Sequence, residues 1–253
     1  MLIKTKVLPG SQDNPDHSVI SEIARVIKNG GIASFPTETV YALGADAYNK
    51  EMVAKIYRIK RRDRSKPLSV FLKGAEQTRR IVDFVTPDAE KLMEKFWPGP
   101  LTLVFTCTSS KLSVVLAKGD KLGVRVSPSK LIAGLLDESG VPVTATSANI
   151  SGKKSCVAAN RVFYFFNGRV ELIIDGGKSN VFLPSTVLDV SSEDTSLIRL
   201  GHIPVDQIKK VVPNLRIPEE EDAKDDCKEE MKVGAASQEP QGGADQTQGS
   251  TLS

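Results

Sequence analysis

The sequence predicts an α/β fold, in which helices flank an open, twisted sheet of mixed parallel and antiparallel strands. Two observations predict it. Short apolar segments alternate with segments whose apolar residues recur every three or four positions, as strands and amphipathic helices do. After residue 100 the strict strand–helix–strand alternation of a parallel, doubly wound sheet is lost. At 253 residues, 40% of them hydrophobic, the chain is long enough to bury a sizeable core.

The helical segments begin and end at residues typical of helix caps. Over 18–29 the apolar side chains share one face, Ser18 can cap the start, and Gly30 and Gly31 follow the end. Asn49 can cap a helix over 50–60. Further helices are expected over 75–83, 87–96, 130–139, 156–166 and 204–211.

The strand segments are short and rich in residues that favour a pleated, buried surface. The first, residues 31–35, ends at Pro36. Others are expected over 68–72, 101–107, 122–126, 143–146, 171–175, 185–190 and 195–200.

Charge and composition divide the chain into parts. Residues 218–253 hold ten acidic and three basic residues and almost no large apolar ones, so this tail is expected to be disordered. The remainder carries a net charge of about +10, which favours an anionic ligand, a nucleotide or RNA, although moderately basic enzymes are common. We therefore expect an N-terminal segment at 1–14, a catalytic domain at 15–205, a short helix and linker at 206–217, and the acidic tail.

Several classes of protein are disfavoured by what the sequence lacks. Cys107, Cys156 and Cys227 have no disulfide or zinc spacing, which favours a reducing compartment. His17 and His202 lie near no Ser or Cys motif, so a histidine-based catalytic triad is not expected. There is no signal-like N-terminus and no apolar run of about 18 residues. We expect a cytoplasmic protein without a membrane segment, either a monomer or a homodimer.

Three polar clusters are the candidate site. SFPTETVYALG (34–44) and VTATSANISG (143–152) each place hydroxyl side chains directly after a buried strand, and KIYRIKRRDRSKP (55–67) is a dense basic run. Open α/β sheets bind ligands beyond their strand ends, and Lys and Arg suit phosphate and carboxylate groups. Each cluster alone also fits a structural role. The basic run can complement a helix dipole, and the hydroxyl segments can form helix caps or Asx turns.

The joint order of the motifs resembles that of the YrdC-like family, the threonylcarbamoyl-AMP synthases. The resemblance covers about residues 15–204. It rests on FPTETVYALGADA, KRRDRSKPL, WPGPLTLVF, GVRVS, VPVTATSANISG, and PSTVLDV followed by IRLG. It implies a twisted open sheet around a basic concave cavity. It also implies a nucleotidyltransferase that makes threonylcarbamoyl-AMP and pyrophosphate from L-threonine, bicarbonate or CO2, and ATP, with magnesium as the cofactor that accompanies ATP. A separate transferase complex would then modify adenosine 37 of tRNA.

The same resemblance implies the site residues. Lys60 and Arg62 would be catalytic and would bind ATP phosphates, and no protein side chain would bind a metal. The other expected ATP contacts are Ser147, Asn149, Ser185 and Arg199. The expected threonine contacts are Thr37, Thr39, Tyr41, Lys66, Arg125 and Thr146. Ala42, Asp63 and Phe71 depart from the family pattern; Phe71 replaces a His found in some members.

Other functions remain open at this point. A module that binds double-stranded RNA or tRNA without adenylation would also suit a basic body. A carbamoyl-adenylate domain of the hydrogenase-maturation type would share the fold, but the zinc-finger and acylphosphatase parts that usually accompany it are not in this sequence. A regulatory relative that binds nucleotide without catalysis would be expected to lack some of Lys60, Arg62, Ser147 and Asn149, all of which are present.

Overall fold

The computed structural model describes residues 3–112, 115–116, 120–179, 181 and 183–218. The helices are α1 (His17–Lys28), α2 (Lys50–Lys60), α3 (Ala75–Arg79), α4 (Pro87–Phe96), α5 (Lys130–Ser139), α6 (Ala159–Phe166) and α7 (Val205–Lys209), with a 3-10 turn at Ser110–Leu112. The strands are β1 (Lys6–Pro9), β2 (Ala33–Phe35), β3 (Ala42–Gly44), β4 (Ser69–Phe71), β5 (Leu101–Thr106), β6 (Lys121–Arg125), β7 (Val143–Thr144), β8 (Thr146–Ser147), β9 (Leu172–Asp175), β10 (Thr186–Asp189) and β11 (Ser196–Arg199).

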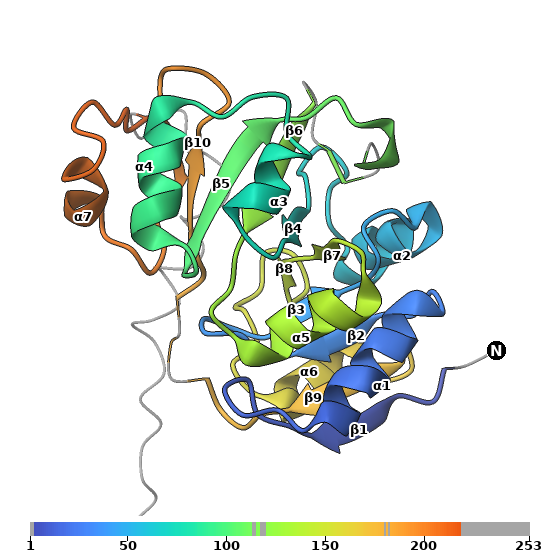
Figure 1. The fold of residues 1–253 in the computed structure, drawn as a ribbon. Coiled ribbons are helices and arrows are strands. Elements are labelled where there is room, and N and C mark those ends of the chain that lie inside the picture. Colours follow the sequence, from blue (N-terminus) through green and yellow to red (C-terminus); the bar gives the residue numbers. More distant parts are fainter. Residues whose placement is uncertain (1–2, 113–114, 117–119, 180, 182, 219–253) are drawn as a thin grey trace, which may run out of the picture.

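The described strands form two mixed sheets, which occupy the lower and upper parts of Figure 1. One has the order β1-β9-β2-β3-β8 and the other β11-β10-β5-β6-β4-β7. Parallel pairs such as β1–β9 and β10–β5 stand beside antiparallel pairs such as β2–β3 and β5–β6. The mixed α/β class is confirmed. The division into two sheets was not evident from the sequence.

The five-stranded sheet is covered on both faces. Successive residues of a strand point to opposite faces, and Leu172 and Ile174 of β9 pack in one apolar cluster while Ile173 packs in another. The first cluster contains residues of α1 and α5, which lie side by side in Figure 1. The second contains residues of α2 and α6. Burial of both faces explains why these strands are continuous apolar runs.

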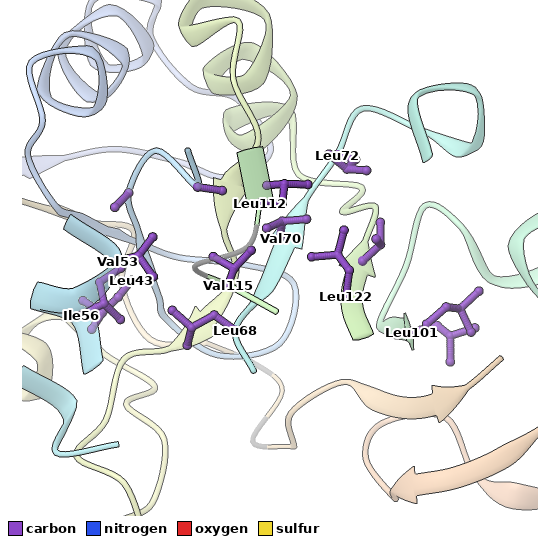
Figure 2. Close-up of a cluster of buried hydrophobic side chains, with 14 of the residues drawn as sticks. Leu43, Val53, Ile56, Leu68, Val70, Leu72, Leu101, Leu112, Val115 and Leu122 are labelled. Carbon is purple, nitrogen blue, oxygen red and sulfur yellow. The ribbon is translucent and has the colours of Figure 1, made fainter. Parts of the chain in front are cut away.

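The two sheets share this second cluster as a common core. Figure 2 shows Leu43 of β3 and Val53 and Ile56 of α2 in the same group as Val70 of β4 and Leu122 of β6. All of these side chains are fully or almost fully buried. A continuous apolar core of this kind fixes the two sheets relative to each other, and with them the polar loops that leave their strands.

Several helix bounds are confirmed where a cap is present. The Asn49 side chain accepts hydrogen bonds from the N–H groups of Glu51 and Met52, both at 3.1 Å, and α2 covers 50–60 as predicted. Thr86 and Ser129 cap α4 and α5 in the same way, and these helices also have the predicted bounds.

Other predictions were wrong. α3 ends at Arg79 rather than at residue 83, because Asp83 N–H bonds to the Thr106 carbonyl of β5 at 3.0 Å. α6 begins at Ala159 rather than near 156, because Cys156 N–H donates to the Ala148 carbonyl at 3.2 Å. The segment 143–146 is not one strand: β7 and β8 lie in different sheets, and Ala145 N–H between them donates to the Ser69 carbonyl at 2.7 Å.

β1 and β3 were not predicted. β1 lies within residues 1–14 and adds a parallel edge strand through its register with β9. Residues 36–41 do not cap a helix; they connect the antiparallel strands β2 and β3. Both strands are too short to show a period in the sequence.

The acidic tail, apart from Pro218, lies outside the described residues, as does Cys227. Cys107 and Cys156 are buried free thiols. None of the described helices has the length and apolar character that a membrane span requires.

Candidate active site

Lys60 ends α2 with its ammonium group inside the protein. The residue is 1% exposed, and its Nζ donates to the Asn149 carbonyl at 3.0 Å, to Asn149 Oδ1 at 3.0 Å, and to the Ser147 carbonyl. An ammonium group has three hydrogens, so each one has an acceptor. Lys60 is therefore not merely a solvated complement of the helix dipole: it ties the end of α2 to the turn that follows β8.

The turn at Ser147–Asn149 is organised around the same contact. Ser147 Oγ donates to Asn149 Oδ1 at 2.7 Å, and Asn149 Nδ2 donates to the Lys153 carbonyl at 2.5 Å. Ser151 N–H in turn donates to the Lys60 carbonyl at 2.8 Å. Two of the predicted ATP contacts are thus held in place by the predicted catalytic lysine.

Burial changes the acid–base behaviour of Lys60. Removal of the ammonium from water, together with the nearby charge of Arg62, lowers the pKa of Lys60 to about 7. Burial also raises the pKa of the Cys156 thiol, to about 11, so this neighbour stays neutral near pH 7. A lysine with such a pKa can gain a proton when an anion arrives.

The backbone conformation of the preceding residue turns Arg62 away from the axis of α2. Arg61 ends α2 in a left-handed conformation, with φ of 52°. The guanidinium of Arg62 then reaches back over the following loop, where Nε donates to the Lys66 carbonyl at 3.3 Å and Nη2 to the Pro67 carbonyl at 3.0 Å. Lys66 also binds Tyr57 through its carbonyl, at 3.0 Å. Arg62 and Lys66 thus belong to one closed loop directly after Lys60.

Arg125 lies at the end of β6 and is 7% exposed. Its Nη2 donates to Glu38 Oε1 at 2.7 Å and to Thr39 Oγ1 at 2.8 Å. Thr39 Oγ1 lies 3.0 Å from Thr37 Oγ1, and the guanidinium lies over the Phe71 ring at 5.8 Å from its centroid. Three residues predicted for threonine therefore form one hydrogen-bonded group.

Tyr41 is fully buried and anchors the loop at Gly176 and Gly177. Its hydroxyl donates to the Gly177 carbonyl at 2.7 Å and accepts from Gly176 N–H at 3.0 Å. Burial raises the pKa of Tyr41 to about 12, so it remains a neutral donor. Thr146, one residue before Ser147, is buried in β8. Tyr41 fixes the 176–177 loop, whereas the Thr146 side chain has no hydrogen bond to any residue that the structure describes.

Ser185 and Arg199 meet at the other sheet. Arg199 Nη2 donates to the Ser185 carbonyl at 2.9 Å, and Ser185 Oγ lies 2.9 Å from Thr102 Oγ1. Thr102 is paired with Arg125 across β5 and β6. Directly paired residues point to the same face of a sheet, so this pair adjoins the Arg125 group.

Backbone pairing links the turn that holds Lys60 to the loop between β2 and β3. Ala42 is the register partner of Ser147, and Ala148 N–H donates to the Tyr41 carbonyl at 2.7 Å. The Lys60 turn, the Arg125 group and the Ser185 pair are therefore neighbours at the junction of the two sheets. In the sequence, the first and last members of these groups, Thr37 and Arg199, lie more than 100 residues apart.

Sequence reasoning missed four residues that hold the site together. Glu38 and Ser127 hydrogen-bond to each other at 2.6 Å, Thr102 contacts Ser185, and Ser179 Oγ donates to the Thr39 carbonyl. Glu38 and Ser127 lie inside the quoted motifs FPTETVYALGADA and GVRVS, so their place in the motifs was the available signal. Thr102 likewise lies inside the quoted motif WPGPLTLVF, whereas nothing in the local sequence marks Ser179.

Two cavities outside this set were identified. One of about 440 Å³ is lined by Lys73, Arg79, Trp97 and Val126, and one of about 360 Å³ by Lys4, Arg25 and Glu171, among others. Among the described residues, no group of three or more His, Cys, Asp or Glu side chains is placed to hold a metal ion.

The chain resembles known proteins over the same segments that carry these motifs. Residues 25–201 match the profile of the Sua5/YciO/YrdC family, which carries the description "telomere recombination". The chain belongs to this family. The match covers the Lys60 turn, the Arg125 group and the Ser185 pair, which confirms the resemblance drawn from the motif order.

Two curated members of the family and one solved structure are close to the chain. The threonylcarbamoyl-AMP synthases of Pyrococcus abyssi and Bacillus subtilis are 38% and 36% identical, over 77% and 78% of this chain and 57% and 58% of their own length. The crystal structure of P. abyssi Sua5 complexed with L-threonine superimposes with a TM-score of 0.80 at 35% identity, covering 84% of this chain and 62% of that one. The chain thus spans little more than half the length of these relatives.

Proposed function

We propose that this protein is a threonylcarbamoyl-AMP synthase, which joins L-threonine, CO2 or bicarbonate, and ATP into threonylcarbamoyl-AMP and pyrophosphate. The observation that carries the proposal is the junction of two chemically different groups in one site. The Lys60 turn supplies a cation, hydroxyls and amides suited to phosphate, and the Arg125 group supplies a guanidinium and hydroxyls suited to an amino acid. The names of the family members above point to the same reaction.

The reaction needs little proton chemistry at the phosphorus. The amine of threonine and CO2 form a carbamate, which is itself an anionic nucleophile, and its oxygen attacks the α-phosphorus while pyrophosphate leaves. Negative charge then grows on the phosphoryl and leaving oxygens. Lys60 and Arg62, held at the end of α2, would stabilise that charge. Neither histidine of the chain is required for this step.

Magnesium would enter with ATP. The groups near the proposed phosphate position are cationic or neutral: Lys60, Arg62, Ser147 and Asn149. This set fits a metal carried by the nucleotide rather than one resident on carboxylates. When bound, magnesium would neutralise charge that develops on the phosphates, while the residues of this chain would position the phosphates and the amino acid.

The test is pyrophosphate release from ATP, with threonine and bicarbonate each omitted in turn. We expect release only when both are present. Release that ignores threonine would point to a different acceptor. No release, combined with salt-sensitive binding of duplex RNA or tRNA, would overturn the synthase and favour the RNA-binding module. The downstream transferase complex with its tRNA, the cytoplasmic location, and the monomeric or homodimeric state stay predictions.

The pKa of Lys60 gives a prediction for nucleotide binding. At pH 8 a lysine whose pKa is about 7 is mostly neutral, and nearby phosphates favour its charged form. ATP binding at pH 8 should therefore take up a proton, roughly one per site at most. Calorimetry in two buffers of different ionisation enthalpy measures this uptake. The Lys60→Met variant should lose it, and equal uptake by wild type and variant would show that another group takes the proton.

A further inference from the structure

Glu38 is the carboxylate of the site that the proposed reaction does not use. It lies in the loop between β2 and β3, and its two oxygens bind two different residues of the β6 end. Oε1 accepts from Arg125 Nη2 at 2.7 Å, and Oε2 accepts from Ser127 Oγ at 2.6 Å. The side chains of Arg125 and Glu38 are only 9% and 16% exposed, so this ion pair is largely shielded from water.

The second hydrogen of Arg125 Nη2 goes to Thr39, whose hydroxyl contacts that of Thr37. Thr37 Oγ1 donates its only hydrogen to the Val40 carbonyl at 2.7 Å. In the 3.0 Å contact between the two threonines, Thr39 must then be the donor and Thr37 the acceptor. A continuous hydrogen-bond chain therefore runs from Arg125 through Thr39 and Thr37.

The rest of the Arg125 guanidinium has hydrogens to offer. Among the described residues, neither Nε nor Nη1 of Arg125 donates to a protein acceptor. Nε is completely shielded from solvent, whereas Nη1 is not. Glu38 and Thr39 together take both hydrogens of Nη2, so the guanidinium cannot rotate about its axis without breaking one of these bonds. Nη1 thereby keeps its hydrogens for a ligand.

We propose that Glu38 is a positioning residue for amino-acid recognition, which holds Arg125 through Nη2 and so directs Nη1 at the carboxylate of the substrate. This rests on the proposed function, in which Arg125 is one of the threonine contacts; a guanidinium suits the carboxylate of that amino acid. Glu38 also neutralises the buried guanidinium, so that charge alone gives the site little attraction for an arbitrary anion. Selection of the substrate then depends on the direction of the Nη1 hydrogen bond.

The test compares two substrates that differ only in the group Arg125 would bind. L-Threoninol keeps the amine, hydroxyl and methyl of threonine but has a hydroxymethyl group in place of the carboxylate. The ratio of kcat/KM for threonine to that for threoninol, measured as pyrophosphate release by the full chain, reports carboxylate recognition. A purely structural defect would lower both values and leave the ratio unchanged.

In Glu38→Ala the ratio should fall about tenfold or more, the effect of losing one directed, charge-assisted hydrogen bond. The KM for ATP should stay within about twofold, since the Lys60 turn is untouched. Glu38→Gln keeps an oxygen for Nη2 and an amide for Ser127, so its ratio should stay within about threefold of wild type. Glu90→Gln is the matched control, because Glu90 forms a bidentate pair with Arg79 at the surface.

Glu38→Asp keeps the measurement decisive if the alanine variant does not fold. It preserves the charge but is one methylene too short to reach both Arg125 and Ser127, so its ratio should fall as in Glu38→Ala. An unchanged ratio in the folded alanine or aspartate variant would overturn the positioning role. So would a glutamine variant as impaired as alanine, because charge rather than direction would then be decisive. A wild-type protein that ignores threonine would instead overturn the proposed function, and that result is separate.

Discussion

Replacement of Lys60 by methionine should lower kcat/KM for pyrophosphate release by about 10² to 10³, the usual effect of losing one group that stabilises developing negative charge. Methionine has a similar length and fills the 1% exposed position better than alanine would. The variant loses both the positive charge beside the phosphates and the three hydrogen bonds that fix the Ser147–Asn149 turn. Steady-state kinetics with ATP and threonine varied separately give the measurement.

The loss of activity must be separated from a loss of fold. The carbonyls of Ser147 and Asn149 lose a donor in the variant, which should cost about 1–3 kcal/mol of unfolding free energy. Thermal melts establish a temperature at which the variant is fully folded, and activity is compared there. Arg58→Met is the matched control: Arg58 is an exposed basic residue in the last turn of the same helix. A folded Lys60→Met protein with activity near that of the control would exclude Lys60 from catalysis.

The position of Lys60 also shows what the sequence could and could not reveal. Asn49, the apolar face of α2 and Lys60 itself predict a helix with basic residues at its end, and the structure agrees. The helix-dipole interpretation assumes that such a lysine is exposed. Its burial depends on the turn after β8, about 90 residues later, and no local pattern encodes that contact.

The strand segments show a second limit. Apolar runs such as 101–107 predicted β5, but burial on both faces removes the alternation that would tell which sheet a strand joins. The chain passes from one sheet to the other at Ala145. In the sequence, the segment 143–146 therefore looked like one strand. The motif order brought distant segments together as one candidate site. Thr102 lies inside the quoted motif WPGPLTLVF but was not singled out, and Ser179 lies in none of the quoted motifs.

Replacement of Arg125 by methionine should lower the free energy of unfolding by about 3–5 kcal/mol, because it leaves the Glu38 carboxylate shielded from water without its counter-charge. Glu38→Met should also be destabilising, since it leaves the guanidinium unpaired. The double variant carries neither charge, so its loss should be about 2 kcal/mol smaller than the sum of the single losses. Equilibrium denaturation of all four proteins measures the coupling.

The surface pair of Arg79 and Glu90 provides the comparison cycle. Its geometry is bidentate, at 2.9 and 2.6 Å, but its side chains are 44% and 42% exposed. Exposed pairs contribute at most about 1 kcal/mol, because water screens the charges and the side chains lose entropy. A coupling at Arg125–Glu38 no larger than this would mean that water reaches the pair in solution. Strong coupling would show instead that the fold keeps a guanidinium desolvated and fixed where the proposed reaction needs to bind a carboxylate.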